Sequence, residues 1–325
     1  MRYSSVTAVF MLIGSPALAA GIELGLPIAC EIGRNCWVQN YVDHDPSAAV
    51  KDYACGGQTY DGHDGTDIRV ANTTSKADVM ASAAGTVSGV RDGVTDRLMR
   101  SEADRATVGN RECGNGVVIN HANGWQTQYC HLRKGSITVK TGERVESGVK
   151  LGEVGYSGLA AFPHVHLTVR HDGREVDPFG GAPNGGEDCG AHKNSLWNAP
   201  AVSVLAYRKG EVIQSGFNSA PIELADLETG GVPQQNLDAA WPALIAYVWA
   251  INLAAGDKVT VILRGPGGIE ATNSTTLDRN KAAYMLFAGK KQPAGGWLPG
   301  EYIGSVTVAN SGEVRLSQIW KASLQ

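Results

Sequence analysis

Short segments in which hydrophobic and polar residues alternate recur along most of the chain, and glycine-rich turns separate them. A period of two is typical of β-strands that are buried on one face. In the segment 164–169 the apolar residues fall on one face, whereas His164 and His166 fall on the other. Two imidazoles on one face can bind a metal, move a proton, or do one of each. A chance pair on a solvated face is the alternative.

The same alternation predicts many strands in the first half of the chain. Asn123-Gly124 is a strong hairpin signal between two such segments. Residues 91–112 are rich in Arg, Asp and Glu, which indicates a solvated insertion that is helical at most. A strand or an extended arm is expected at 37–43. Strands are expected from Thr66 onward and at 79–81, 85–90, 117–119, 125–132, 136–139, 142–145 and 151–154.

The second half predicts a separate all-β unit. Alternating segments at 203–207, 243–251, 258–263, 283–287, 301–308 and 314–320 are divided by turn sequences. About seven strands at this spacing favour an immunoglobulin-like β-sandwich. Trp249 and Trp320 are expected in its core, and Trp241 and Trp297, beside prolines and glycines, are expected to be exposed.

Length and composition agree with two folded domains. The chain has 325 residues, of which 43% are hydrophobic, so it can bury two cores. The net charge of −4 and the lack of a long basic run argue against nucleic acid. Outside the amino terminus no stretch is apolar enough for stable membrane insertion. The expected division is 1–20, 21–195 and 200–325, with a Gly-rich linker at 180–198.

The first 20 residues predict a secretory signal peptide. Arg2 supplies the positive charge, residues 6–13 form a short apolar segment, and 17–19 (ALA) fit a cleavage site. The mature protein is therefore expected to be periplasmic or secreted.

Six cysteines follow the signal, and an even number in an exported chain favours disulfides over a thiolate metal site. Proximity in the sequence is the only guide to their pairing. The expected disulfides are Cys30–Cys36, Cys113–Cys130 and Cys55–Cys189.

Two further segments carry candidate chemistry. Gly62 and Gly65 flank His63 closely, so His63 and Asp67 are expected on a turn that enters a strand, not on a helix. Imidazole and carboxylate suit zinc, although a His–Asp hydrogen bond in a turn is equally compatible. His131 lies near the end of a returning strand, where its side chain could face a cleft.

Taken in order, these motifs resemble those of the lysostaphin-like zinc metallopeptidases, which are peptidoglycan endopeptidases. The resemblance covers roughly residues 60–180. Each motif alone is weak, but their order and spacing together are specific. The matching segments are 62–68 (GHDGTDI), 129–132 (YCHL), 139–145 (VKTGERV), 151–155 (LGEVG) and 163–166 (PHVH).

The resemblance implies a twisted antiparallel β-sheet with the site in a groove above it. It assigns His63, Asp67 and His166 as Zn²⁺ ligands, and His131 and His164 as catalytic residues. Three protein ligands leave one zinc position open, as catalysis requires. One free histidine can accept the proton of the attacking water, and the other can stabilise the oxyanion or protonate the leaving amine. Which histidine does which stays open.

There are two departures from the family. Val165 stands where Leu is common, which is a conservative change, whereas the segment 91–112 is longer than expected and bears on the shape of the groove and the length of the substrate. A side chain of the amino-terminal arm, Asn40 or His44, could also coordinate the zinc as a further ligand.

The expected function is a secreted zinc endopeptidase that hydrolyses peptide cross-links of peptidoglycan. A non-catalytic peptidoglycan-binding or hydrolase-activating protein is one alternative, and a zinc peptidase acting on proteins is another. All five expected site residues are present, which argues against the first alternative. The second domain has no histidine or cysteine, so it is expected to bind cell wall or a protein partner, or to act as a spacer.

Overall fold

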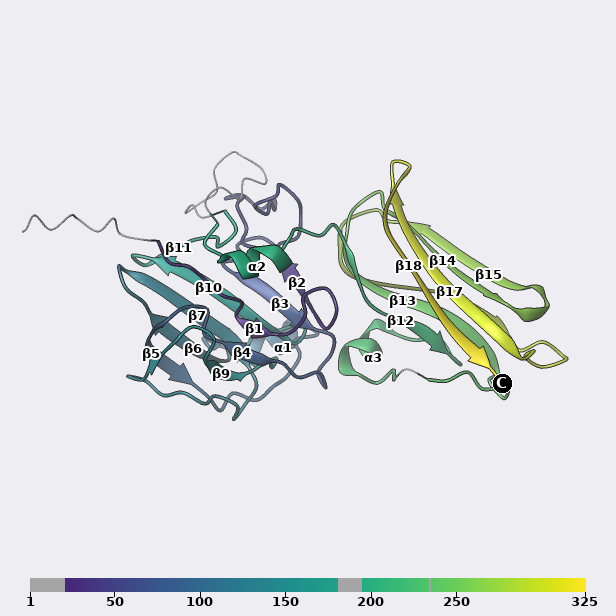
Figure 1. Ribbon diagram of the computed structural model, residues 1–325, viewed down its shortest axis with the longest axis horizontal. Coiled ribbons are helices and arrows are strands. Elements are labelled where there is room, and N and C mark those ends of the chain that lie inside the picture. Colours follow the sequence, from purple (N-terminus) through teal and green to yellow (C-terminus); the bar gives the residue numbers. More distant parts are fainter. Residues whose placement is uncertain (1–20, 181–194, 234) are drawn as a thin grey trace, which may run out of the picture.

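The computed structural model describes residues 21–180, 195–233 and 235–325. The expected signal peptide, Cys189 and most of the linker lie outside the described residues. The described chain is mainly β and forms two lobes (Figure 1). None of its helices is long and apolar enough to cross a lipid bilayer.

The first lobe is built on an eight-stranded antiparallel sheet, which confirms the sheet expected for this half. Its strands follow the order β2-β3-β10-β7-β6-β5-β8, and β11 pairs with β10. A second sheet has the order β1-β4-β9. The strands are β1 (Ile28–Ala29), β2 (Cys36–Asn40), β3 (Thr66–Val70), β4 (Asp78–Met80), β5 (Gly85–Arg91), β6 (Asn115–Asn120), β7 (Trp125–Leu132), β8 (Arg144–Val145), β9 (Lys150–Glu153), β10 (His164–His171) and β11 (Arg174–Glu175).

The alternation in β10 divides the strand between core and site. Val165, Leu167 and Val169 are almost fully buried in the core of the first lobe. His166 lies opposite Asp67 of β3 and Cys130 of β7. Three segments that are distant in sequence therefore meet on one face of the sheet.

The structure differs from the expected elements of the first lobe in two places. Residues 136–139 form no strand, and 150–153 pair with β4 in the smaller sheet. The insertion at 91–112 contains one short helix, α1 (Glu102–Ala106), but its Met99 and Val108 are buried. The insertion is therefore anchored at two apolar points.

The second lobe contains two antiparallel sheets that share an apolar core. Their orders are β12-β13-β16 and β15-β14-β17-β18. An immunoglobulin-like topology stays a prediction. The strands are β12 (Glu211–Asn218), β13 (Ala243–Leu253), β14 (Lys258–Gly265), β15 (Ile269–Thr276), β16 (Lys281–Lys291), β17 (Gly300–Asn310) and β18 (Glu313–Leu324).

Three expectations for the second half were wrong. Residues 203–207 are not a strand. Helix α2 (Ala199–Val204), which has Pro200 in its first turn and the Asn198 side chain as its cap, extends into this segment. Trp297 is buried, since its indole N–H donates to the carbonyl oxygen of Trp241 at 2.7 Å. Strands β12 and β15 were also missed, because turn-forming and polar residues interrupt their alternation.

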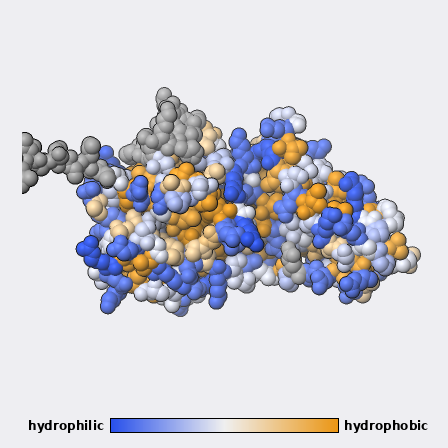
Figure 2. All heavy atoms as spheres, in the orientation of Figure 1, coloured by the Kyte–Doolittle hydropathy of each residue, from blue (hydrophilic) through white to orange (hydrophobic). Residues whose placement is uncertain are grey.

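The lobes meet through polar contacts between β2 and strands of the second lobe. The Asn252 amide donates to the carbonyl oxygen of Val38 at 3.3 Å, and the Gln39 amide donates to that of Ala282 at 3.2 Å. Arg100 pairs with Glu228 of helix α3 (Leu224–Thr229). Figure 2 shows hydrophilic residues along this junction and hydrophobic residues over the centre of the first lobe.

Two of the expected disulfides are formed, Cys30–Cys36 and Cys113–Cys130. Cys55 is also disulfide-bonded, and its expected partner, Cys189, lies outside the described residues.

Candidate metal centre and catalytic histidines

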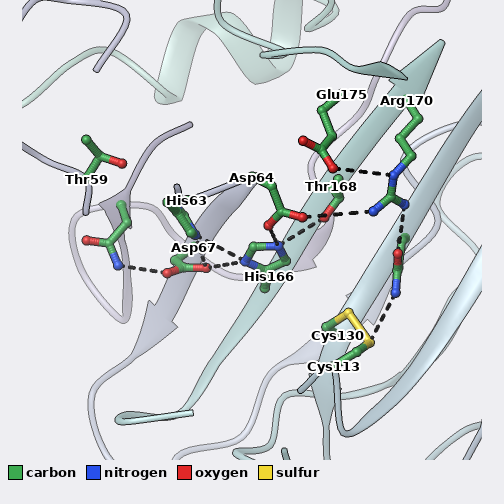
Figure 3. A network of polar contacts seen from close by, with 12 residues as sticks. Thr59, His63, Asp64, Asp67, Cys113, Cys130, His166, Thr168, Arg170 and Glu175 are labelled. Atoms are coloured by element: carbon green, nitrogen blue, oxygen red, sulfur yellow. Dashed lines mark hydrogen bonds and ion pairs between the residues drawn. A yellow bond between two sulfur atoms is a disulfide. The ribbon is translucent and has the colours of Figure 1, made fainter. Parts of the chain in front are cut away.

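His63, Asp67 and His166 point toward one another above the sheet (Figure 3). His63 lies on the turn before β3, Asp67 on β3, and His166 on β10. Asp67 Oδ1 is 3.2 Å from His63 Nε2 and 2.9 Å from His166 Nδ1. The two imidazole nitrogens are 3.2 Å apart. All three side chains are buried.

These separations fit the donor set of a zinc site. Ligands in a tetrahedron at about 2.0–2.1 Å from zinc stand about 3.3–3.4 Å from one another. The three observed separations, between 2.9 and 3.2 Å, are close to that edge length. The residues could therefore hold zinc after small movements.

The hydrogen bonds of His63 and His166 indicate which nitrogens carry lone pairs. His63 Nδ1 lies 2.6 Å from the carbonyl oxygen of Tyr41, which only accepts, so the proton is on Nδ1. His166 Nε2 faces Thr168 Oγ1 at 3.0 Å and an Asp64 carboxylate oxygen at 3.1 Å, which favours a proton there. When both imidazoles are neutral, His63 Nε2 and His166 Nδ1 are thus left as acceptors beside the Asp67 carboxylate. Acceptors this close repel one another unless a cation or a proton lies between them.

The carboxylates make this pocket favourable for positive charge. Burial lowers the pKa of His166, but hydrogen bonds and charge from Asp64 and Asp67 outweigh it and raise the pKa to about 9. Burial raises the pKa of Asp67, but His63 and His164 outweigh it and hold that pKa well below its usual range. The same field that stabilises a proton would stabilise a metal ion.

His131 and His164 lie beside the three candidate ligands, with ring centroids 4.6 Å apart. The Nδ1 atom of each lies 2.8 Å from a backbone carbonyl oxygen, that of Ser157 for His131 and that of Phe162 for His164. Each Nδ1 therefore carries a proton, which leaves Nε2 as the second functional atom. Burial, followed by the charges of His164 and His166, lowers the pKa of His131 well below its ordinary value.

Comparison with known proteins relates part of the chain to a family. Residues 61–178 match the model of peptidase family M23. The chain contains an M23 peptidase domain. The M23 domain includes all five residues expected from the sequence, and the structure brings all five together. Their individual roles as ligands and catalysts stay predictions.

Curated relatives match parts of the chain. Over 64 residues the chain is 42% identical to the peptidoglycan DD-endopeptidase ShyA of Vibrio cholerae, covering 20% of this chain and 14% of that protein. Over 92 residues it is 36% identical to the cell division protein DipM of Caulobacter vibrioides, covering 26% and 15%. The matches thus span about a seventh of each relative's length.

A solved structure also resembles part of this chain. The catalytic domain of the prophage-encoded M23 protein EnpA from Enterococcus faecalis, solved as a point mutant, aligns over 49% of this chain and 94% of its own length. The identity is 22% and the TM-score is 0.32.

A second layer of contacts surrounds the candidate ligands of the M23 domain. The Asn40 amide, at the end of β2, donates to Asp67 Oδ2 at 2.7 Å. Gly65 packs against His166, since a Cβ placed on Gly65 would lie 2.6 Å from Nε2. Asp64 continues the network to Arg170, whose guanidinium is 4.0 Å away (Figure 3). Such partners orient ligands and are typical of metal sites.

The strand end that carries His131 is held from several sides. The His131 amide donates to the carbonyl oxygen of Cys113 at 2.8 Å, and the Cys113–Cys130 disulfide ties that segment to β7. The buried Ser157 hydroxyl donates to the carbonyl oxygen of Leu132 at 2.7 Å. His131 has a φ of 63°, which is unfavourable for a residue with a Cβ. The surrounding contacts hold this conformation and aim the imidazole at the site.

The two candidate side chains of the arm have different positions. Asn40 reaches Asp67, as described above, whereas His44 Nε2 pairs with Asp177 Oδ2 at 2.6 Å. Asp64 and Thr168 were missed because each lies beside a candidate residue in sequence without a motif of its own. Tyr60, with its ring centroid 4.4 Å from that of His63, was also missed and is half exposed.

Proposed function

We propose that this protein is an exported zinc-dependent endopeptidase that hydrolyses peptide cross-links in peptidoglycan. The observation that carries the proposal is the group of three candidate ligand atoms 2.9–3.2 Å apart, inside a domain that matches peptidase family M23. The substrate class follows the name of a curated relative, a peptidoglycan DD-endopeptidase. Export rests on the signal peptide expected at residues 1–20 and on the disulfides.

His63, Asp67 and His166 would hold the zinc, and Asn40 would orient the Asp67 carboxylate. A bound zinc supplies a Lewis acid that makes water nucleophilic near neutral pH and polarises a peptide carbonyl. His131 is the proton acceptor for the attacking water, because its lowered pKa keeps Nε2 unprotonated. His164 is then the group that hydrogen-bonds the developing oxyanion.

The test combines zinc content with digestion of purified sacculi. Wild type is expected to hold about one zinc per chain and to release cross-linked peptides. His166→Ala should lose both metal and activity, and His131→Ala should keep metal but lose activity. A casein digest run in parallel tests the protein-peptidase alternative. Zinc-loaded wild type that leaves sacculi intact would refute the proposed substrate, and absence of zinc would refute the mechanism.

A further inference from the structure

A line of stacked side chains connects the second lobe to His164. The guanidinium carbon of Arg69, on β3, lies 4.8 Å from the ring centroid of Trp249 on β13. The same carbon is 4.9 Å from the ring centroid of Phe162. The Phe162 ring is in turn 4.5 Å from that of His164, at an interplanar angle of 33°. Each member is within stacking or cation–π range of the next.

Arg69 lies at the centre of this line, and the aromatic rings on either side of it help to hold its buried guanidinium in place. Its side chain is fully buried, and among the described residues no carboxylate forms an ion pair with it. Burial lowers its pKa to about 10. A buried guanidinium needs compensation, which here comes from oxygen acceptors, two aromatic faces and the negative charge of Glu228 beyond ion-pair distance. Replacing one of the two aromatic rings, Trp249 or Phe162, with an aliphatic side chain would therefore shift the Arg69 side chain.

A second contact ties Arg69 to the other lobe. Arg69 Nη1 donates to Gln39 Oε1 at 2.6 Å, and the Gln39 amide donates to the carbonyl oxygen of Ala282 at 3.2 Å. Arg69 is also the register partner of His164 between β3 and β10. A displacement of Arg69 would thus reach His164 through Phe162 and through the strand pair.

We propose that Trp249, acting through Arg69 and Phe162, is a positioning residue for His164, so that the second lobe completes the catalytic site. Phe162 is suited to transmit the effect, since its ring stacks on the imidazole and its carbonyl oxygen accepts from His164 Nδ1 at 2.8 Å. The proposal rests on the proposed function, because it takes His164 as a catalytic residue. It gives the second lobe a role that needs no ligand of its own.

The test uses the full-length zinc-loaded protein and a soluble cross-linked peptide released from sacculi. Trp249→Leu should lower kcat about tenfold while KM stays within about twofold and zinc content is unchanged, because misplacing a catalytic group by a fraction of an ångström affects turnover. Trp249→Phe, which keeps an aromatic face, should restore most of kcat. The matched control is Trp297→Leu, a buried tryptophan of the same lobe that packs beside Tyr302.

Phe162→Leu provides a second variant, in case Trp249→Leu does not fold. It should lower kcat by a similar factor, and Phe162→Tyr should restore it. If Trp249 and Phe162 position His164 through the same chain of contacts, the Trp249→Leu/Phe162→Leu double variant should be no slower than the slower of the two single variants. Equal kcat for wild type, Trp249→Leu and Phe162→Leu would overturn the inference and leave the proposed function intact. An inactive wild type would instead refute the proposed function.

Discussion

Replacing Gly65 with alanine should weaken zinc binding about 10- to 100-fold. A Cβ at this position would lie 2.6 Å from His166 Nε2 and 2.7 Å from the carbonyl oxygen of Leu167, whereas ordinary contacts start at 3.4 Å. The imidazole and the β10 backbone must therefore both move away from Gly65, by about 0.8 Å and 0.7 Å respectively. Gly65 does not have a positive φ, so the effect is due to space and not to backbone strain. The corresponding loss of binding free energy is about 1.4–2.7 kcal/mol.

The measurement is zinc affinity by competition with a chelating indicator, with circular dichroism as a check of folding. Gly89→Ala in β5 is the matched control, because the nearest atoms to its Cβ would be 3.9 and 4.0 Å away. If Gly65→Ala binds zinc as tightly as Gly89→Ala, then His166 is not held where the structure has it, or it is not a ligand.

Three other perturbations test the surroundings of the site. Asn40→Ala should lower zinc affinity about tenfold without unfolding, because it removes a hydrogen bond that orients Asp67. Replacing both cysteines of the Cys113–Cys130 disulfide should lower the free energy of unfolding by about 3 kcal/mol and should also lower turnover. Replacing both cysteines of Cys30–Cys36, which closes a shorter loop, should lower the free energy of unfolding by about 2 kcal/mol and leave turnover unchanged. Removing the metal with a chelator should lower the melting temperature, and added zinc should restore it.

Each of these has a clear contrary result. Unchanged zinc affinity in Asn40→Ala would mean that the amide does not orient Asp67. Equal turnover in the two cysteine variants would mean that the Cys113–Cys130 disulfide does not position His131. A melting temperature that chelator and zinc leave unchanged would argue against a metal bound by the folded state.

The sequence was most informative where chemistry and alternation coincide. The two histidines of 164–166 share a strand face because side chains alternate with a period of two, and the structure has them so. The glycines around His63 indicated a turn entering a strand, and β3 begins at Thr66. These features are local, so the sequence alone could predict them.

The sequence could not predict contacts that depend on tertiary packing. Asn40 reaches Asp67 because β2 pairs with β3, and nothing near Asn40 in sequence indicates that pairing. No motif in the sequence singles out Arg69, yet it is buried against Trp249 of the second lobe. Trp297 reads as exposed among glycines and prolines, yet its indole finds a carbonyl acceptor far away in sequence.

The contacts of β2 with the second lobe have a consequence for solubility. As the first strand in the sheet order, β2 has one side without a neighbouring strand among the described residues of its sheet. Exposed strand edges recruit further strands and promote aggregation. Here the Asn252 side-chain amide of the second lobe donates a hydrogen bond to the carbonyl oxygen of Val38 on that strand. The second lobe therefore shields an aggregation-prone edge, and the first lobe prepared without it would be expected to self-associate.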